Sequence, residues 1–224
     1  MRLSLVVAML AIVTAASAQL SLGVKGGVNM SNFTGKEVKD TKMKLGFNVG
    51  VSADYEFMPN MAIQSGLYFV TKGATLAEKE EELLGLKVKS SIALNAMYLQ
   101  VPVHFAYKLD VTPGTRLVFH AGPYIAYGVG GKTKAKIKIS GDIPAEFKDK
   151  INEEIKKIEG EGVNTFDKKE GIKRLDAGLG IGVGAEFGRF LVDLGWDMGL
   201  LNLSEDKNSP VRNQNAYLSV GYKF

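Results

Sequence analysis

The chain contains two histidines, His104 and His120, whose imidazole side chains are suited to binding a metal or responding to pH. Each lies on the polar face of a stretch in which polar and apolar residues alternate, and a turn within residues 110–114 joins the two stretches. A hairpin centred near Thr112 would place the two rings opposite each other. Two ligands are too few for a typical zinc site. We therefore predict that the pair packs in the protein interior, with no metal and no cofactor.

Charged residues recur on the polar faces of these alternating stretches, with both signs in similar numbers. Interior charges are tolerated only when they are paired. We therefore predict that ion pairs and hydrogen bonds fill the space that the sheet encloses, and that Lys72 and Lys223 face this space. The predicted members of this polar network are Lys25, Lys44, Asp54, Glu56, His104, Arg116, His120, Arg174, Asp176, Glu186, Asp193 and Asp197.

The sequence carries none of the common catalytic motifs. Cysteine is absent, which excludes disulfides, thiolate metal sites and cysteine nucleophiles. Neither Gly-x-Ser-x-Gly nor His-Glu-x-x-His occurs, and the glycines at 178, 180, 182 and 184 alternate within a strand pattern instead of opening a helix. The net charge of +4 is not concentrated in the way a nucleic-acid-binding protein requires. These features predict a protein that is not an enzyme and does not bind nucleic acid.

The elements that position these residues repeat with a period of two, which indicates β-strands. Between Met43 and Phe57 every second residue is apolar, and the residues between them are small, polar or charged. That length suits a tilted strand crossing a bilayer better than the five or six residues of an average strand. Eight such stretches occur, at residues 20–32, 43–57, 61–72, 96–108, 115–129, 173–187, 190–202 and 213–224.

The connections between these stretches alternate between short and long. Residues 58–60, 110–114 and 188–189 form short turns, whereas 34–41, 73–87, 130–171 and 204–212 are longer and polar. This pattern is typical of an outer-membrane barrel with periplasmic turns and long extracellular loops. The fold class predicted is therefore all-β: an eight-stranded antiparallel up-and-down transmembrane β-barrel. The alternative is a water-soluble barrel or sandwich with its apolar face inside.

The N-terminal residues have the pattern of an export signal. A positive start is followed by an uncharged apolar run and by the small-x-small sequence Ala16-Ser17-Ala18. This predicts a signal peptide at residues 1–18, an outer-membrane barrel domain at residues 19–224 and location in the cell outer membrane. Within that domain, residues 130–171 form a long charged extracellular loop, in which apolar residues at 147, 151, 155 and 158 predict a short amphipathic helix.

The last strand ends in Phe224, with Tyr222 on the same face, and resembles the terminal signal of bacterial outer-membrane barrels. Three other stretches are LGVKGGVNMSNFTG (22–35), YLQVPVHFAYK (98–108) and WDMGLLNLS (196–204), the last preceding NAYLSVGYKF (215–224). With these, the chain resembles the PorT-like outer-membrane β-barrel family of the Bacteroidetes, often labelled "porin family protein". The resemblance implies an OmpA/OmpX-like barrel of eight strands, and one family member is known as an accessory to protein secretion and gliding.

An eight-stranded barrel has an interior that side chains fill. The leading hypothesis is therefore an outer-membrane barrel with a largely plugged lumen and a structural or surface-interaction role. The alternative is a low-conductance porin or transport protein, or an accessory subunit of a protein-secretion complex. The partners expected are outer-membrane lipid and lipopolysaccharide, the barrel-assembly machinery and a protein bound at the extracellular loops.

Overall fold

The computed structural model describes residues 19–35, 41–83, 86–140, 150, 153, 155, 160, 162–167, 171–204 and 210–224. The expected signal peptide lies outside these residues. Of the helix expected within 147–158, only residues 150, 153 and 155 are described, and each has a helical backbone. No helix in the described part of the chain is both long and apolar enough to cross a membrane.

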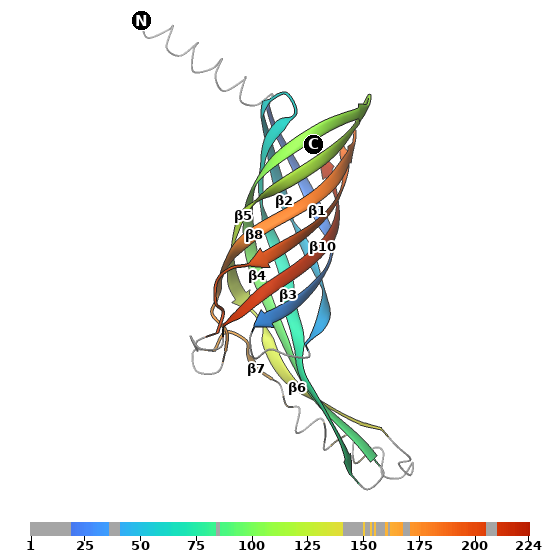
Figure 1. Ribbon diagram of the computed structural model, residues 1–224, viewed down its shortest axis with the longest axis vertical. Coiled ribbons are helices and arrows are strands. Elements are labelled where there is room, and N and C mark those ends of the chain that lie inside the picture. Colours follow the sequence, from blue (N-terminus) through green and yellow to red (C-terminus); the bar gives the residue numbers. More distant parts are fainter. Residues whose placement is uncertain are drawn as a thin grey trace, which may run out of the picture.

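Eight antiparallel strands close into the predicted barrel, shown in Figure 1. The ring closes because β1 pairs with β10, from Gly23 opposite Lys223 to Gly35 opposite Val211. Its strands, in order around the ring, are β1 (Leu20–Gly35), β2 (Lys42–Met58), β3 (Met61–Leu83), β4 (Leu86–Thr112), β5 (Thr115–Gly130), β8 (Leu175–Phe187), β9 (Phe190–Gly199) and β10 (Val211–Lys223).

The apolar face of the barrel points outward. Leu45 is 70% exposed and Ile181 is 63% exposed, whereas Lys108 and Asp176 are fully buried. A water-soluble barrel or sandwich would bury the apolar side chains and expose the charges, so that alternative is wrong. The closed ring also leaves no open sheet edge within the bilayer, where an unpaired backbone group would be costly.

Three tight turns lie at one end of the barrel, here called the turn end. In two of them proline precedes a residue with positive φ, Asn60 at 66° and Gly114 at 80°, which suits a type II turn. The third contains Gly188, with φ of 58°. Figure 1 shows the opposite end, here called the loop end, extended by strands that continue beyond the ring.

This extension replaces part of the expected loops. β3 and β4 continue past the end of β2 and remain paired as far as Leu83 opposite Leu86, so most of the polar loop expected at 73–87 is a hairpin. Within the expected loop 130–171, β6 (Lys132–Ser140) pairs with the outer part of β4, and β7 (Val163–Asn164) pairs with β6.

Candidate functional site

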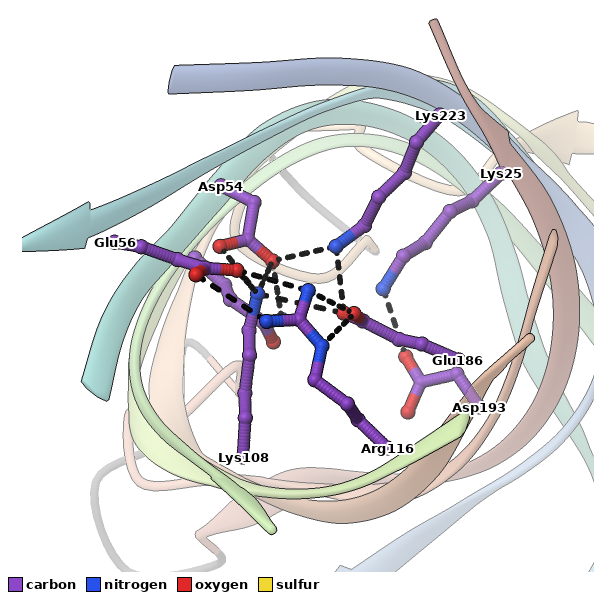
Figure 2. Close-up of polar contacts among 9 residues, drawn as sticks. Lys25, Asp54, Glu56, Lys108, Arg116, Glu186, Asp193 and Lys223 are labelled. Carbon is purple, nitrogen blue, oxygen red and sulfur yellow. Dashed lines mark hydrogen bonds and ion pairs between the residues drawn. The ribbon is translucent and has the colours of Figure 1, made fainter. Parts of the chain in front are cut away.

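The candidate site is the polar interior of the barrel, and its turn end holds a cluster of six charged residues. We call this the turn-end ion cluster: Asp54, Glu56, Lys108, Arg116, Glu186 and Lys223. Lys108 lies at its centre and is fully buried. Its Nζ lies 2.9 and 2.8 Å from the two Asp54 carboxylate oxygens and 2.6 Å from Glu56 Oε1, and these contacts are drawn in Figure 2.

Two further cations complete the turn-end ion cluster. Arg116 donates to Glu186 Oε2 through Nη2 at 2.7 Å and to Glu56 Oε2 through Nη1 at 3.2 Å. Lys223 donates to Glu186 Oε1 at 2.6 Å and to Asp54 Oδ2 at 3.1 Å. Three cations thus face three carboxylates, and each carboxylate contacts two or more cations. The cluster is electrically balanced.

The two histidines lie in contact further along the lumen. Their Nδ1 atoms are 2.9 Å apart, and their rings stack with centroids 5.1 Å apart and an interplanar angle of 15°. His120 Nε2 lies 2.8 Å from Asp193 Oδ1, and Lys25 Nζ lies 3.0 Å from Asp193 Oδ2. Among the described residues, no group of three His, Asp or Glu side chains is arranged to hold a metal ion.

The predicted register of this hairpin is wrong by two residues along one strand. His120 faces Ala106 and not His104, because the turn residues are Pro113 and Gly114 and the register shifts between Asp110 and Thr112. His104 therefore lies diagonally from His120 on the same face. Diagonal neighbours are still within reach of long or aromatic side chains, which explains why the rings meet.

Nearer the loop end, Lys72 pairs with Asp176 at 3.3 Å, and both side chains are fully buried. Asp176 Oδ2 also accepts hydrogen bonds from Asn213 at 2.9 Å and from the Tyr124 hydroxyl at 3.3 Å. The Lys72 ammonium lies 4.8 Å from the centroid of the Tyr124 ring and 5.4 Å from that of Tyr98. A cation over an aromatic face is attracted by the ring, so this lysine is held by both charge and π contacts.

A group of buried apolar side chains lies in the lumen at the loop end. We call it the mouth plug, and it comprises Phe33, Ala74, Leu94, Ala96, Tyr98, Tyr124, Ala126, Phe166 and Leu203. Phe166 follows β7 and packs edge-on against Tyr98, with ring centroids 5.5 Å apart. Gly128 makes room for it, since a β-carbon at that position would collide with the Phe166 ring. Leu203, from the connection between β9 and β10, is fully buried.

Two residues of the predicted polar network lie at the mouth plug instead of among the paired carboxylates. The Arg174 guanidinium donates to the Gly128 carbonyl at 2.8 Å and lies 5.1 Å from the centroid of the Phe166 ring. Lys44 hydrogen-bonds to the Asn95 side chain. The other ten predicted members, among them Asp197, lie in the groups described here or line the cavity between them.

Sequence reasoning missed the central position of Lys108 in the turn-end ion cluster and the burial of Phe166 and Leu203 in the lumen. Lys108 could have been found, because it continues the polar alternation of residues 96–108. Phe166 is an isolated aromatic residue in a polar segment, and Leu203 follows the end of a strand. Nothing in the local pattern of these two residues indicates that they insert into the barrel.

The predicted C-terminal signal lies at the turn end. Tyr222 packs against Phe190 and Phe224, with ring centroids 5.3 and 5.9 Å apart. Its hydroxyl accepts a hydrogen bond from Arg189 at 3.3 Å. Phe224 is 73% exposed, and its backbone N–H donates to the Leu22 carbonyl at 2.9 Å. The terminal side chain is therefore accessible at the rim, while its backbone is tied to β1.

Comparisons with known proteins give a family match and several similar solved structures. Residues 15–205 match the family described as "Outer membrane protein beta-barrel domain". Similar solved structures include Ail of Yersinia pestis, with 17% identity, a TM-score of 0.42, and coverage of 92% of this chain and 99% of that chain. OprG of Pseudomonas aeruginosa shares 11% identity, with a TM-score of 0.43 and coverage of 91% of this chain and 95% of that chain. Neisserial surface protein A shares 12% identity, with a TM-score of 0.41 and coverage of 91% of this chain and 97% of that chain.

No curated protein matches the chain. The family match spans most of the chain, and the barrel presents its apolar face outward. The protein is therefore a transmembrane β-barrel of the cell outer membrane, and the chain belongs to the outer membrane protein beta-barrel domain family.

Proposed function

We propose that this protein is a non-enzymatic outer-membrane barrel with a closed lumen and a structural or surface-interaction role. The observation that supports this proposal is that interior side chains contact one another across the lumen at two separate levels. At the turn end, the balanced ion cluster crosses the interior, as Figure 2 shows. At the loop end, the mouth plug fills the interior with aromatic and aliphatic side chains. A barrel of this strand number has little interior space beyond its side chains.

The strand extension at the loop end supports the surface-interaction part. Loops at this end of an outer-membrane barrel face the cell exterior. Lys132 and Lys134 of β6 are exposed there, and cations at this level would attract the anionic groups of lipopolysaccharide. A partner protein approaching from the cell exterior would contact the same strand extension before the rest of the barrel. At the opposite end, the exposed Phe224 supports recognition by the barrel-assembly machinery.

The chemistry of the interior supports a role other than catalysis. The histidines bond to each other and to Asp193, and Asp193 is paired with Lys25. These four side chains contain the groups that could act as an acid or base. Each such group is hydrogen-bonded or ion-paired to another of the four, except for His104 Nε2. The sequence also lacks the motifs of the common hydrolases. A role specific to the PorT-like group remains a prediction from sequence resemblance.

Planar-bilayer recording tests the closed lumen. Purified wild-type protein is expected to give no discrete current steps above those of a detergent blank, with a large porin as the positive control. The Phe166→Gly variant is also expected to remain silent, because the turn-end ion cluster still crosses the lumen. Reproducible steps from the wild-type protein would refute the closed lumen and favour the low-conductance alternative. A subunit of a secretion complex recovered with the protein from native membranes would favour the accessory alternative.

A further inference from the structure

A cavity of about 80 Å³ lies between the turn-end ion cluster and the mouth plug. Three buried polar atoms of its lining have no hydrogen-bond partner among the described residues: His104 Nε2, Gln100 Oε1 and Asn48 Nδ2. Each of these side chains belongs to a residue that is more than nine-tenths buried. Buried polar groups in folded proteins are nearly always hydrogen-bonded, so a cavity bounded by several unpaired ones is suited to a polar occupant.

Asp197 adds a carboxylate to a cavity lining whose other charged residues, Lys25, Asp54, Asp193 and Lys223, are ion-paired. Its Oδ2 accepts hydrogen bonds from two neutral amides, Gln100 Nε2 at 3.0 Å and Asn215 Nδ2 at 3.4 Å. Asp197 forms no ion pair with any described residue, although it is almost fully buried. The neighbouring lysine, Lys72, is paired with Asp176. A buried carboxylate is costly unless a positive charge accompanies it, so a cation is favoured over water alone.

The hydrogen-bonding direction of the histidine pair makes His104 Nε2 an acceptor. His120 Nε2 donates its proton to Asp193 Oδ1, and this leaves His120 Nδ1 without a proton in the neutral ring. His104 Nδ1 must then donate to His120 Nδ1, since one of the two must be the donor. His104 Nε2 therefore carries a lone pair. It joins Gln100 Oε1 and the Asp197 carboxylate as the third acceptor lining the cavity.

Two of these acceptors converge beside the backbone of Gly180. A β-carbon at Gly180 would lie 2.8 Å from His104 Nε2 and 2.9 Å from Asp197 Oδ1. Gln100 is attached to the other oxygen of the same carboxylate, because its amide nitrogen donates to Asp197 Oδ2. Both side chains therefore pack directly against the Gly180 backbone, and a larger residue at position 180 would have to displace them.

We propose that this cavity binds a small primary ammonium group, which donates its three N–H bonds to His104 Nε2, Gln100 Oε1 and Asp197 Oδ1. An ammonium group has three donors and no acceptor, which matches the three acceptors, and its charge balances Asp197. Hard metal cations prefer oxygen ligands throughout, whereas one acceptor here is an imidazole nitrogen. The nearby Ala53, Val70, Pro102 and Leu191 offer an apolar wall to a short alkyl group. Binding does not depend on whether the lumen conducts.

Selective ¹⁵N labelling of histidine tests this site directly, because only two histidines contribute signals. The full mature chain, without an added histidine tag, is reconstituted in detergent micelles and titrated with methylammonium chloride at constant ionic strength and neutral pH. Tetramethylammonium chloride is the matched probe, since it has the same charge and no N–H donor. We expect a saturable shift of the unpaired ring nitrogen of His104 with methylammonium, and none with tetramethylammonium.

Variants assign the shift to the cavity. Asp197→Asn can keep its bonds to Gln100 and Asn215 while removing the charge, and we expect it to weaken binding roughly 10- to 100-fold. Glu56→Gln is the matched control, since it removes a carboxylate that neither lines the cavity nor pairs with Lys72, and it should bind within a few-fold of wild type. Gly180→Ala should weaken binding by placing a methyl group between the acceptors.

Three results would overturn the proposal. The His104 signal would stay unshifted if water alone fills the cavity or if Asp197 carries its own proton. Equal shifts with tetramethylammonium would show a general salt effect. Unchanged affinity in a folded Asp197→Asn variant, with folding checked by its gel mobility before boiling, would show that the amine binds elsewhere.

Discussion

Replacing Lys108 with methionine removes the charge at the centre of the turn-end ion cluster and keeps most of the apolar stem. The lost contacts are those to Asp54 at 2.9 and 2.8 Å, to Glu56 at 2.6 Å and to Glu186 at 3.4 Å. The lysine is fully buried, so water is not in place to replace them. The cluster changes from three cations and three carboxylates to two cations and three carboxylates.

The size of the effect follows from this imbalance. Breaking a buried ion pair by removing one partner costs about 3–5 kcal/mol. We expect a loss near the lower end, about 3 kcal/mol, because Arg116 and Lys223 still contact the same carboxylates and Glu56 is partly exposed. Such a loss lowers the folding equilibrium constant by a factor of about 150.

Urea unfolding in lipid vesicles measures this change, with the folded fraction read from the mobility of unboiled samples. Lys132→Met, at an exposed position on β6, is the matched control and should change the unfolding free energy by less than about 0.5 kcal/mol. Adding Glu56→Gln to Lys108→Met restores equal numbers of cations and carboxylates, and should recover more than half of the loss. A loss below about 1 kcal/mol in Lys108→Met, or additive losses in the double variant, would refute the coupled cluster.

Three further changes test the outer face, the mouth plug and the C-terminus. Leu194→Arg places a charge on the lipid face opposite Leu218, and should lower the free energy of unfolding in vesicles by about 2–4 kcal/mol; a wild-type urea midpoint would contradict an outward position. Gly128→Ala forces a β-carbon against the Phe166 ring and should cost about 1–3 kcal/mol in the same assay, whereas unchanged stability would argue against the plug. Deleting Phe224 should reduce the folded fraction in native membranes without changing the urea midpoint of refolded protein, and a normal folded fraction in cells would count against an assembly signal.

The strand positions and the direction in which their side chains face could be predicted from the sequence. In a strand, the alternation between Met43 and Phe57 places all the apolar side chains on one face, because consecutive side chains point to opposite faces. The short turns were also recognisable, since Pro59-Asn60 and Pro113-Gly114 carry residues that suit a tight turn. The same alternation placed Asp54 and Arg116 on the inner faces of their strands, although it did not show which charges meet.

Which side chains meet in the lumen depends on the register between neighbouring strands. The alternating pattern cannot distinguish registers that differ by two or another even number of residues. Shifting one strand by two positions keeps every polar side chain inside and changes every contact. The diagonal arrangement of His104 and His120 is one result of this. The mouth plug could not be predicted for another reason. Phe166 contacts Tyr98 and Gly128 from a connecting segment whose sequence has no repeating pattern.

The strands, the apolar outer face and the residue types of the interior could be predicted from sequence, because a two-residue period assigns each side chain to a face without knowledge of its neighbours. The folded chain was needed to show that Lys108 joins three carboxylates, that Phe166 packs into the loop end, and that Asp197 borders a cavity without forming an ion pair to a described residue. These contacts arise between strands far apart in the chain. They depend on how the closed ring sets its register and curvature, which no local pattern encodes.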